Sequence, residues 1–334
     1  MEKIRIAQMG TSAYSHGYSI FRTLLAHPEL FEVVGYALPE NEREKFPAQM
    51  PEFSRCREMT VEEILADPTI EAVAVETEEI YLTKYARMVA DAGKHLHMEK
   101  PGGLDPEEFR ALVSTLKEKK LAFSTGYMYR FNPAVSAAIE RVRRGELGKV
   151  YAVEAHMGGK HPAAQRDWLE VFPGGMTFFL GCHLIDLVYR ILGEPQEVIP
   201  LTASTGIDGN TVGDYGMVVF QYPTGPSFIK VCDEEPGGFT RRQLVICGER
   251  GTIEIRPLEL HAGGDNVYTV SNECFSTDWG APWQTEKYPP FGRYDAMLQN
   301  FAELVRGKEN PYTYDYELGL YELLMKACER RKVK

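Results

Sequence analysis

The chain has 334 residues, of which 44% are hydrophobic and 25% charged, and this ordinary globular composition excludes a disordered or low-complexity protein. With 37 basic and 48 acidic residues the net charge is −11, which argues against a nucleic-acid-binding surface. No apolar run reaches the roughly 20 residues that cross a bilayer, so we expect no membrane partner. The six scattered cysteines form no Cys-x-x-Cys pair, which is typical of free thiols in a reducing cytoplasm.

The first part of the chain alternates between strand and helix patterns. Continuous apolar runs predict five strands covered on both faces, at Ile4–Met9, Phe31–Ala37, Ile70–Val75, His95–Met98 and Leu121–Thr125. Between them, helical apolar stripes follow a capping box at Thr60–Glu63 and a helix start at Asp105-Pro106. Strands alternating with helices predict a doubly wound parallel sheet over residues 1–126.

From about residue 149 the pattern changes to strands with few helices between them. The predicted strands are Val150–Met157, Gly216–Tyr222, Pro226–Cys232, Gln243–Cys247 and Thr252–Ile255, and helices are expected at Gly181–Leu192, Tyr294–Val305 and Leu318–Cys328. The segment Gly263–Pro290 is expected to be an irregular surface loop. Residues 127–334 therefore form an α+β domain with a mainly antiparallel, open sheet, whose exposed face favours a homo-oligomer.

A doubly wound sheet binds ligands at the carboxyl ends of its strands, and its first strand-to-helix turn is the usual phosphate site. That turn keeps Gly10 of the glycine fingerprint but has Ser12 and Ser15 where the other glycines would stand. The second strand ends at Leu38 rather than at an acid, with Glu40 and Arg43 following, so the choice between NAD and NADP stays open. A domain of this type that binds no dinucleotide is the alternative.

Two further segments carry candidate chemistry. Lys100 closes the run His95–Pro101 at the end of a predicted strand, where a lysine can bond a substrate hydroxyl; the alternative is a solvated lysine. His183 and Asp186 lie three apart on one face of a predicted helix, so the histidine can take a hydroxyl proton while the acid holds its other nitrogen or a second substrate group. The alternative is a histidine buried by ordinary packing.

Other polar and aromatic residues are weaker candidates. We expect Tyr129, Arg130, His156 and Trp168 to contact substrate, although packing explains them equally well. The group of Glu154, His156, His161 and His183 matches no strong metal signature, so no metal is expected.

Taken together, these segments resemble the Gfo/Idh/MocA family, which includes glucose–fructose oxidoreductase and inositol dehydrogenases. The resemblance rests on Asp67–Val75, Ala92–Pro101, Tyr129–Pro133, Gly145–Gly148, Gly181–Asp186 and Gly248–Glu254. It implies an N-terminal Rossmann domain, NAD or NADP as cofactor, a sugar or polyol substrate, and a homodimer or homotetramer built through the C-terminal sheet. It also implies that Lys100 polarises the substrate oxygen, that His183 is the general acid/base and that Asp186 binds substrate or the histidine. The residues expected around the dinucleotide are Gly10, Thr11, Ser12, Ser15, His16, Leu38, Thr77, Glu78, Glu99 and Lys100.

The chain departs from the family pattern at several of these positions. Phe179 stands where the family often has an Asp, and Glu78 and Glu79 follow Thr77 where Thr-Pro is common. We therefore carry three hypotheses. The first is an NAD(P)-dependent oxidoreductase acting on a secondary alcohol, in which Lys100 and His183 converge on one alcohol oxygen. The second is a non-catalytic ligand- or nucleotide-binding regulatory paralogue, and the third is a hydrolase, lyase or isomerase using the same pocket.

Overall fold

The computed structural model describes residues 2–276 and 278–329. The chain divides into two compact units: unit 1 contains Met1–Tyr127 and Tyr294–Tyr321, and unit 2 contains Met128–Arg293 and Glu322–Lys334. Among the described residues, no helix is long and apolar enough to cross a membrane.

Unit 1 is built on a parallel five-stranded sheet with the strand order β2-β1-β3-β4-β5. Its strands are β1 (Ile4–Met9), β2 (Phe31–Ala37), β3 (Ala72–Val75), β4 (His95–Met98) and β5 (Phe123–Thr125). The three central strands are buried along almost their whole length, which explains why the sequence shows continuous apolar runs rather than alternation. The predicted doubly wound sheet is therefore confirmed.

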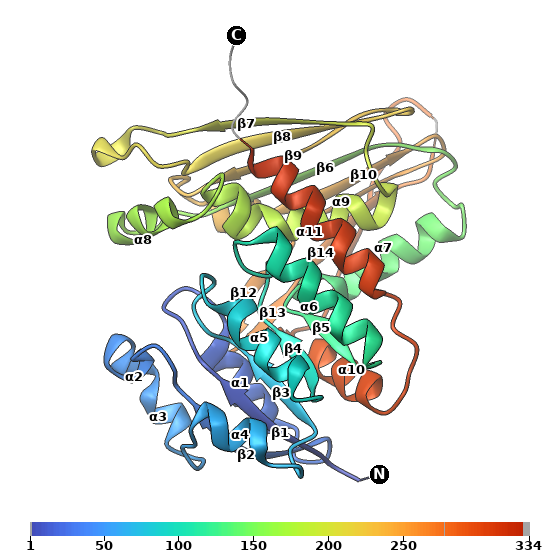
Figure 1. The fold of residues 1–334 in the computed structure, drawn as a ribbon. Coiled ribbons are helices and arrows are strands. Elements are labelled where there is room, and N and C mark those ends of the chain that lie inside the picture. Colours follow the sequence, from blue (N-terminus) through green and yellow to red (C-terminus); the bar gives the residue numbers. More distant parts are fainter. Residues whose placement is uncertain (1, 277, 330–334) are drawn as a thin grey trace. The chain divides into compact units, whose positions relative to one another are not determined.

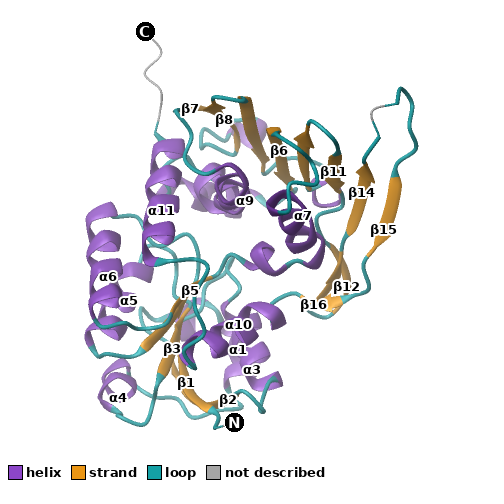
Figure 2. Cartoon of the chain, turned by 90° about the vertical axis from the view of Figure 1, so that its right-hand side faces the viewer, coloured by secondary structure: helices purple, strands orange, loops and turns teal. Residues whose placement is uncertain are grey.

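Helices cover both faces of this sheet. Figure 2 shows α5 and α6 on one side of the strands and α1 and α10 on the other. The helices of unit 1 are α1 (Gly17–Ala26), α2 (Glu42–Lys45), a 3-10 turn (Pro47–Gln49), α3 (Met50–Phe53), α4 (Val61–Ala66), α5 (Leu82–Asp91), α6 (Pro106–Glu118), α10 (Asp295–Val305) and the first part of α11 (Tyr314–Cys328). Both predicted helix starts are confirmed: Thr60 and Glu63 form the capping box of α4, and Asp105 caps α6.

The C-terminal segment 294–321 belongs to unit 1, whereas the sequence analysis assigned it to the second domain. Phe301 of α10 is fully buried with its ring 5.7 Å from that of His97 on β4. Near the start of α11, Glu317 accepts a hydrogen bond from Thr125 of β5 at 3.1 Å, and in the middle of the helix Tyr321 stacks on Phe109 of α6. The apolar stripes of these helices predicted burial, but periodicity alone does not say which sheet a helix covers.

Unit 2 contains an eight-stranded sheet with the order β15-β14-β11-β10-β6-β9-β8-β7, antiparallel except for the parallel pair β6–β9. Figure 1 shows β7, β8 and β9 of this sheet above α9. The strands of this sheet are β6 (Val150–Gly158), β7 (Glu197–Ala203), β8 (Tyr215–Tyr222), β9 (Gly225–Cys232), β10 (Gln243–Gly248), β11 (Thr252–Ile255), β14 (Val270–Cys274) and β15 (Gln284–Lys287). The predicted mainly antiparallel sheet is confirmed.

The helices of unit 2 are α7 (Pro133–Arg143), α8 (Ala163–Trp168), α9 (Cys182–Leu192) and the last part of α11, with short turns at Met128–Phe131, Leu169–Val171, Thr177–Gly181, Ile207–Gly209 and Gly238–Arg241. Of these helices, α9 lies against β6 and β9, and α7 lies against β11.

One prediction for unit 2 was wrong and one strand was missed. Segment 263–290 is not an irregular loop. It contains β13 (Asn266–Tyr268), which forms a three-stranded sheet with the flanking strands β12 (Leu260–Gly263) and β16 (Phe291–Gly292), and it also contains the pair β14–β15. These strands are short and largely exposed, so they show no apolar run. Strand β7, an edge strand with Pro200 in it, went undetected for the same reason.

Candidate functional site

The turn after β1 is shaped by Gly10. Its φ is +86°, and a Cβ there would lie 2.6 Å from the backbone of Thr77, so only glycine fits between the ends of β1 and β3. The two serines of the turn face inward within it. The Ser12 hydroxyl accepts the N–H of Ser15 at 3.1 Å, and Gln49 donates to the Ser12 carbonyl at 2.8 Å. They therefore stabilise the turn that glycines form in the usual fingerprint.

A buried carboxyl occupies part of the same turn. Thr11 donates its N–H to Glu42 of α2 at 3.2 Å, and its hydroxyl is bonded to Gln49. Glu42 is fully buried, and burial raises its pKa to about 9, so it is mainly neutral near pH 7. Sequence reasoning missed this residue, because nothing in the pattern of a short charged helix marks one carboxyl as buried.

Two donors of this turn stay available for a phosphate. Within the described part of the chain, no group accepts a hydrogen bond from the backbone N–H of Ser12 or Ala13. They precede α1, whose N-terminal end carries a positive partial charge. The turn therefore fits a dinucleotide pyrophosphate, with Glu42 as a competing acceptor at Thr11.

The end of β2 carries no free ribose-binding group. Leu38 packs against the buried rings of Phe21, Tyr36 and Phe53. Glu40 accepts hydrogen bonds from Lys84 at 2.6 Å and from the hydroxyl of Tyr85 at 2.7 Å. Arg43 is paired with Glu58 and also contacts the hydroxyl of Tyr36. Glu40 and Arg43 are thus both held by other side chains of unit 1.

Lys100 follows β4 at the carboxyl end of the sheet, and its side chain is buried although it carries an amine. Glu99 beside it accepts the N–H of Lys100 at 2.7 Å and contacts His16 Nδ1 at 3.2 Å. The structure thus brings three predicted residues, His16, Glu99 and Lys100, to one edge of the sheet. Thr77 lies against Gly10, and Glu78 pairs with Lys45 at 2.6 Å.

His183 is the second residue of α9, directly after a π-helical turn at Thr177–Gly181. It is buried, and the ring of Tyr129 packs against it edge-on, with centroids 5.3 Å apart. The Tyr129 hydroxyl donates to Glu259, which also accepts from Arg242 at 2.9 Å and from Arg293 at 2.6 Å. The charged cluster around Glu259 thus holds the Tyr129 ring in place against the His183 side chain.

Asp186 is engaged by Arg130. The guanidinium Nε lies 3.1 Å from both Asp186 oxygens and a terminal nitrogen lies 2.9 Å from one of them, so the pair is bidentate. Both side chains are buried. One predicted catalytic residue and one predicted substrate residue are therefore partners of each other.

The remaining predicted substrate residues also have partners in unit 2. Trp168 packs edge-on against Phe172 and Phe179, with centroids 4.6 and 4.9 Å apart. Phe179, which replaces the acid common in the family, is thus part of an aromatic cluster. His156 Nε2 lies 2.7 Å from a Glu235 oxygen, and burial lowers the pKa of His156 to about 4.

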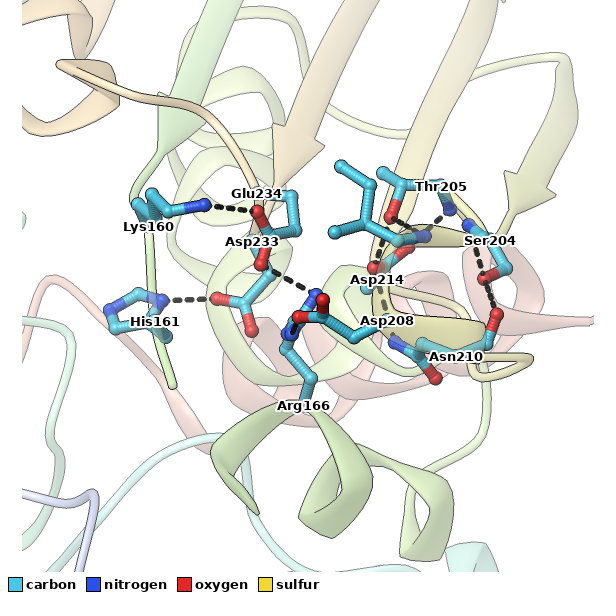
Figure 3. A network of polar contacts seen from close by, with 12 residues as sticks. Lys160, His161, Arg166, Ser204, Thr205, Asp208, Asn210, Asp214, Asp233 and Glu234 are labelled. Carbon is cyan, nitrogen blue, oxygen red and sulfur yellow. Dashed lines mark hydrogen bonds and ion pairs between the residues drawn. The ribbon is translucent and has the colours of Figure 1, made fainter. Parts of the chain in front are cut away.

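A network of ion pairs surrounds Arg166, which is almost completely buried (Figure 3). Its terminal nitrogens pair with Asp208 and Glu234, each at 2.5 Å, and Lys160 reaches Glu234 at 2.7 Å. His161 is bonded to Asp233 in the same view. Among the described residues, no group of three or more His, Cys, Asp or Glu is arranged to hold a metal ion.

Comparison with known proteins assigns both parts of the chain to one family. The profile described as "Oxidoreductase family, NAD-binding Rossmann fold" matches residues 4–127, and the profile of the GFO/IDH/MocA C-terminal domain matches residues 135–254. The chain belongs to the Gfo/Idh/MocA family. It is an oxidoreductase with an NAD-binding Rossmann domain, so the predicted cofactor class, NAD or NADP, is confirmed together with the family resemblance.

The relatives with a named activity include sugar and polyol dehydrogenases. The chain is 28% identical to the scyllo-inositol 2-dehydrogenase (NAD(+)) of Bacillus subtilis over 264 residues, which cover 76% of this chain and 73% of that one. It is also 28% identical to D-xylose 1-dehydrogenase (NADP(+)) 2 of Haloferax volcanii over 256 residues, covering 75% and 74%. The aldose-aldose oxidoreductase structure from Caulobacter crescentus shares the fold, with a TM-score of 0.80 at 20% identity over 98% of both chains.

Proposed function

We propose that the protein transfers a hydride between NAD or NADP and a secondary alcohol of a sugar, a polyol or a derivative of these. The observation that carries this proposal is the match of both family profiles, one to each part of the chain. The relatives named for inositol and xylose support the substrate class. The buried position of Lys100 at the carboxyl edge supports its place in the reaction, because ligands of doubly wound sheets bind at that edge.

In this proposal the residues of the chain bind the cofactor, orient the substrate oxygen and accept its proton. The N–H groups of Ser12 and Ala13 would hold the pyrophosphate, and the bound nicotinamide supplies the hydride chemistry. Lys100 would donate a hydrogen bond to the reacting oxygen from Nζ, and His183 would take the hydroxyl proton on a ring nitrogen. Lys100 and His183 belong to different units, and their convergence on one oxygen stays a prediction.

Asp186 has a positioning role in this proposal. Because both of its carboxylate oxygens accept from Arg130, it holds the guanidinium and the α9 backbone together rather than offering a free oxygen to a sugar. His183 lies one helical turn earlier on the same helix, so the pair fixes the part of α9 that carries the histidine.

Calorimetric titration tests the cofactor, and a turnover assay tests the reaction. We expect heat of binding with at least one of NAD+, NADH, NADP+ and NADPH, followed by a change in reduced-nicotinamide absorbance with a panel of sugars and polyols. Lys100→Ala should lower turnover by orders of magnitude, whereas Lys3→Ala, at an exposed lysine of the same unit, should leave it unchanged. Equal turnover in both variants would remove Lys100 from the reaction.

Two observations favour a second candidate, a regulatory paralogue that binds ligand without turnover. Glu42 takes one N–H of the phosphate turn, and Phe179 offers an aromatic ring where the family often has an acid. This candidate predicts tight binding of a nucleotide or sugar with neither net reduction nor any product. A product formed without a redox change would instead indicate the hydrolase, lyase or isomerase alternative.

We also propose that the protein is a cytoplasmic homodimer or homotetramer that associates through the open face of the unit 2 sheet. Leu201 of β7 is 50% exposed and pairs with Met217 of β8, so the two side chains lie on the same face of this sheet. Light scattering after gel filtration should report an oligomer, and the double variant L201E/M217E should shift it to monomer.

A further inference from the structure

Two of the glutamates at the carboxyl edge of unit 1 lie side by side. Val75 of β3 pairs with Met98 of β4 in the parallel sheet, so the next residues along the two strands, Glu76 and Glu99, are neighbours. Both are buried, with exposed fractions of 0% and 1%. Two adjacent carboxylates that are shielded from water repel each other. One of them must therefore be protonated, or a cationic group must lie beside the pair.

On one side, Glu99 is surrounded by cationic and donor groups. Its carboxylate lies 3.2 Å from Nδ1 of His16 and accepts the N–H of Lys100 at 2.7 Å. Burial by itself raises the pKa of Glu99, but these two neighbours lower it well below its ordinary value. Glu99 therefore carries the negative charge of the pair.

On the other side, Glu76 faces an imidazole. Its Oε1 lies 3.6 Å from Nε2 of His97, and within the described residues neither oxygen of Glu76 nor this nitrogen has a hydrogen-bond partner. The other ring nitrogen, Nδ1, lies 3.2 Å from the hydroxyl of Ser124 on β5. When Nδ1–H donates to Ser124, Nε2 is left as an acceptor aimed at the Glu76 carboxyl.

The charges of this second pair follow from its surroundings. Burial, and then the charge of Glu99, raise the pKa of Glu76 well above its ordinary value, while burial lowers the pKa of His97 to about 4. Near pH 7 a neutral carboxylic acid therefore faces a neutral imidazole. A small closure of the 3.6 Å gap makes the carboxyl O–H a donor to Nε2.

We propose that Glu76 is a positioning residue for Lys100. Glu76 lies between Glu99 and His97 and holds one proton, so that the Glu76–Glu99 pair carries a single negative charge. The proposal rests on the proposed function, because it assigns that charge to the reaction at Lys100. The charged and titratable groups that face Glu76 are Glu99, Lys100 and His97 from β4 and its end, and Glu79 from the turn before α5; the start of α1 approaches it at Gly17.

The single proton matters because of the charge beside the reacting oxygen. An alcohol that gives up a hydride first develops negative charge on its oxygen, and Lys100 would stabilise that charge. A second carboxylate next to Lys100 opposes the development of this negative charge on the substrate oxygen. It also attracts the Lys100 ammonium away from that oxygen. Release of the Glu76 proton at alkaline pH therefore slows the reaction without changing any contact to substrate.

The proton itself can be observed by infrared spectroscopy. A protonated carboxylic acid has a C=O stretch that a carboxylate lacks, and we expect this band in the wild-type protein at neutral pH. Glu76→Gln should remove one such band, His97→Phe should shift it because the acceptor is lost, and Glu170→Gln, at an exposed glutamate, should leave it in place. An unchanged band in Glu76→Gln would overturn the proposal.

The pH profile tests the role at Lys100. Gln keeps the shape of Glu76 but cannot ionise, so kcat of Glu76→Gln near pH 7 should stay within about threefold of wild type, while the alkaline loss of kcat moves up by about one pH unit or more. Thermal unfolding serves as the folding control. An identical alkaline limb in both proteins overturns the positioning role. Absence of turnover in the wild-type protein and in every variant also overturns the positioning role. The infrared band does not depend on activity, so a failure of the proposed function can be told apart from the absence of the Glu76 proton.

Discussion

Glu259 gives the sharpest stability prediction for unit 2. It is 1% exposed and accepts hydrogen bonds from Arg242, Arg293 and the Tyr129 hydroxyl. Burial by itself raises the pKa of Glu259, but Arg293 and Arg242 lower it from 4.5 to about 2. Each pKa unit corresponds to about 1.4 kcal/mol, so ionised Glu259 contributes about 3 kcal/mol to the free energy of unfolding near pH 7.

The change to test is Glu259→Gln, which leaves the buried Arg242 and the partly buried Arg293 without their carboxylate. We expect a loss of about 3 kcal/mol near pH 7, in line with the cost of breaking a buried ion pair. The folded-state pKa is depressed, so the stabilisation is present above pH 4.5 and is lost as the pH falls towards 2. The difference between wild type and variant should therefore shrink over that window.

Urea unfolding followed by tryptophan fluorescence measures this directly. The three tryptophans, Trp168, Trp279 and Trp283, all belong to unit 2, so the signal reports the unit that contains Glu259. Glu170→Gln is the matched control at an exposed glutamate of the same unit. A loss below about 1 kcal/mol near pH 7, or a difference that stays constant down to pH 2, would refute the reasoning.

Three further predictions concern other parts of the molecule. Gly10→Ala should destabilise unit 1 by well over the roughly 1 kcal/mol expected for Gly93→Ala. Both glycines have positive φ, but only a Cβ at Gly10 would clash with the backbone of another residue, Thr77. Thermal unfolding of the two variants side by side measures the difference. Arg130→Met should cost about 3 kcal/mol because it breaks the buried ion pair with Asp186, and a urea midpoint equal to wild type would contradict it. Burial lowers the pKa of His97 from 6.5 to about 4, so between these pH values the folded state binds fewer protons than the unfolded chain, and stability falls as the pH drops. His97→Phe should flatten this part of the curve of stability against pH. An equally steep curve in the variant would count against a neutral buried imidazole.

The amino-acid sequence by itself determined the elements that local chemistry controls. Continuous apolar runs marked the covered strands of unit 1, and the Thr60 and Asp105 caps marked two helix starts, because both signals come from residues close together in the chain. The same local reasoning placed Lys100 at the end of β4 and His183 on α9. The short, largely exposed strands of segment 263–290 carry no such signal and were taken for a loop.

Only the tertiary structure decided which polar groups are buried and which partner each one has. Glu76 becomes the neighbour of Glu99 through the register of β3 and β4, and Glu42 of α2 accepts the N–H of Thr11 in the phosphate turn, 31 residues earlier in the chain. Arg130 and Asp186 stood in the sequence as separate candidates, and the fold makes them one ion pair. The physical reason is the same in each case: desolvation and pairing depend on residues far apart in the chain, which no local pattern brings together.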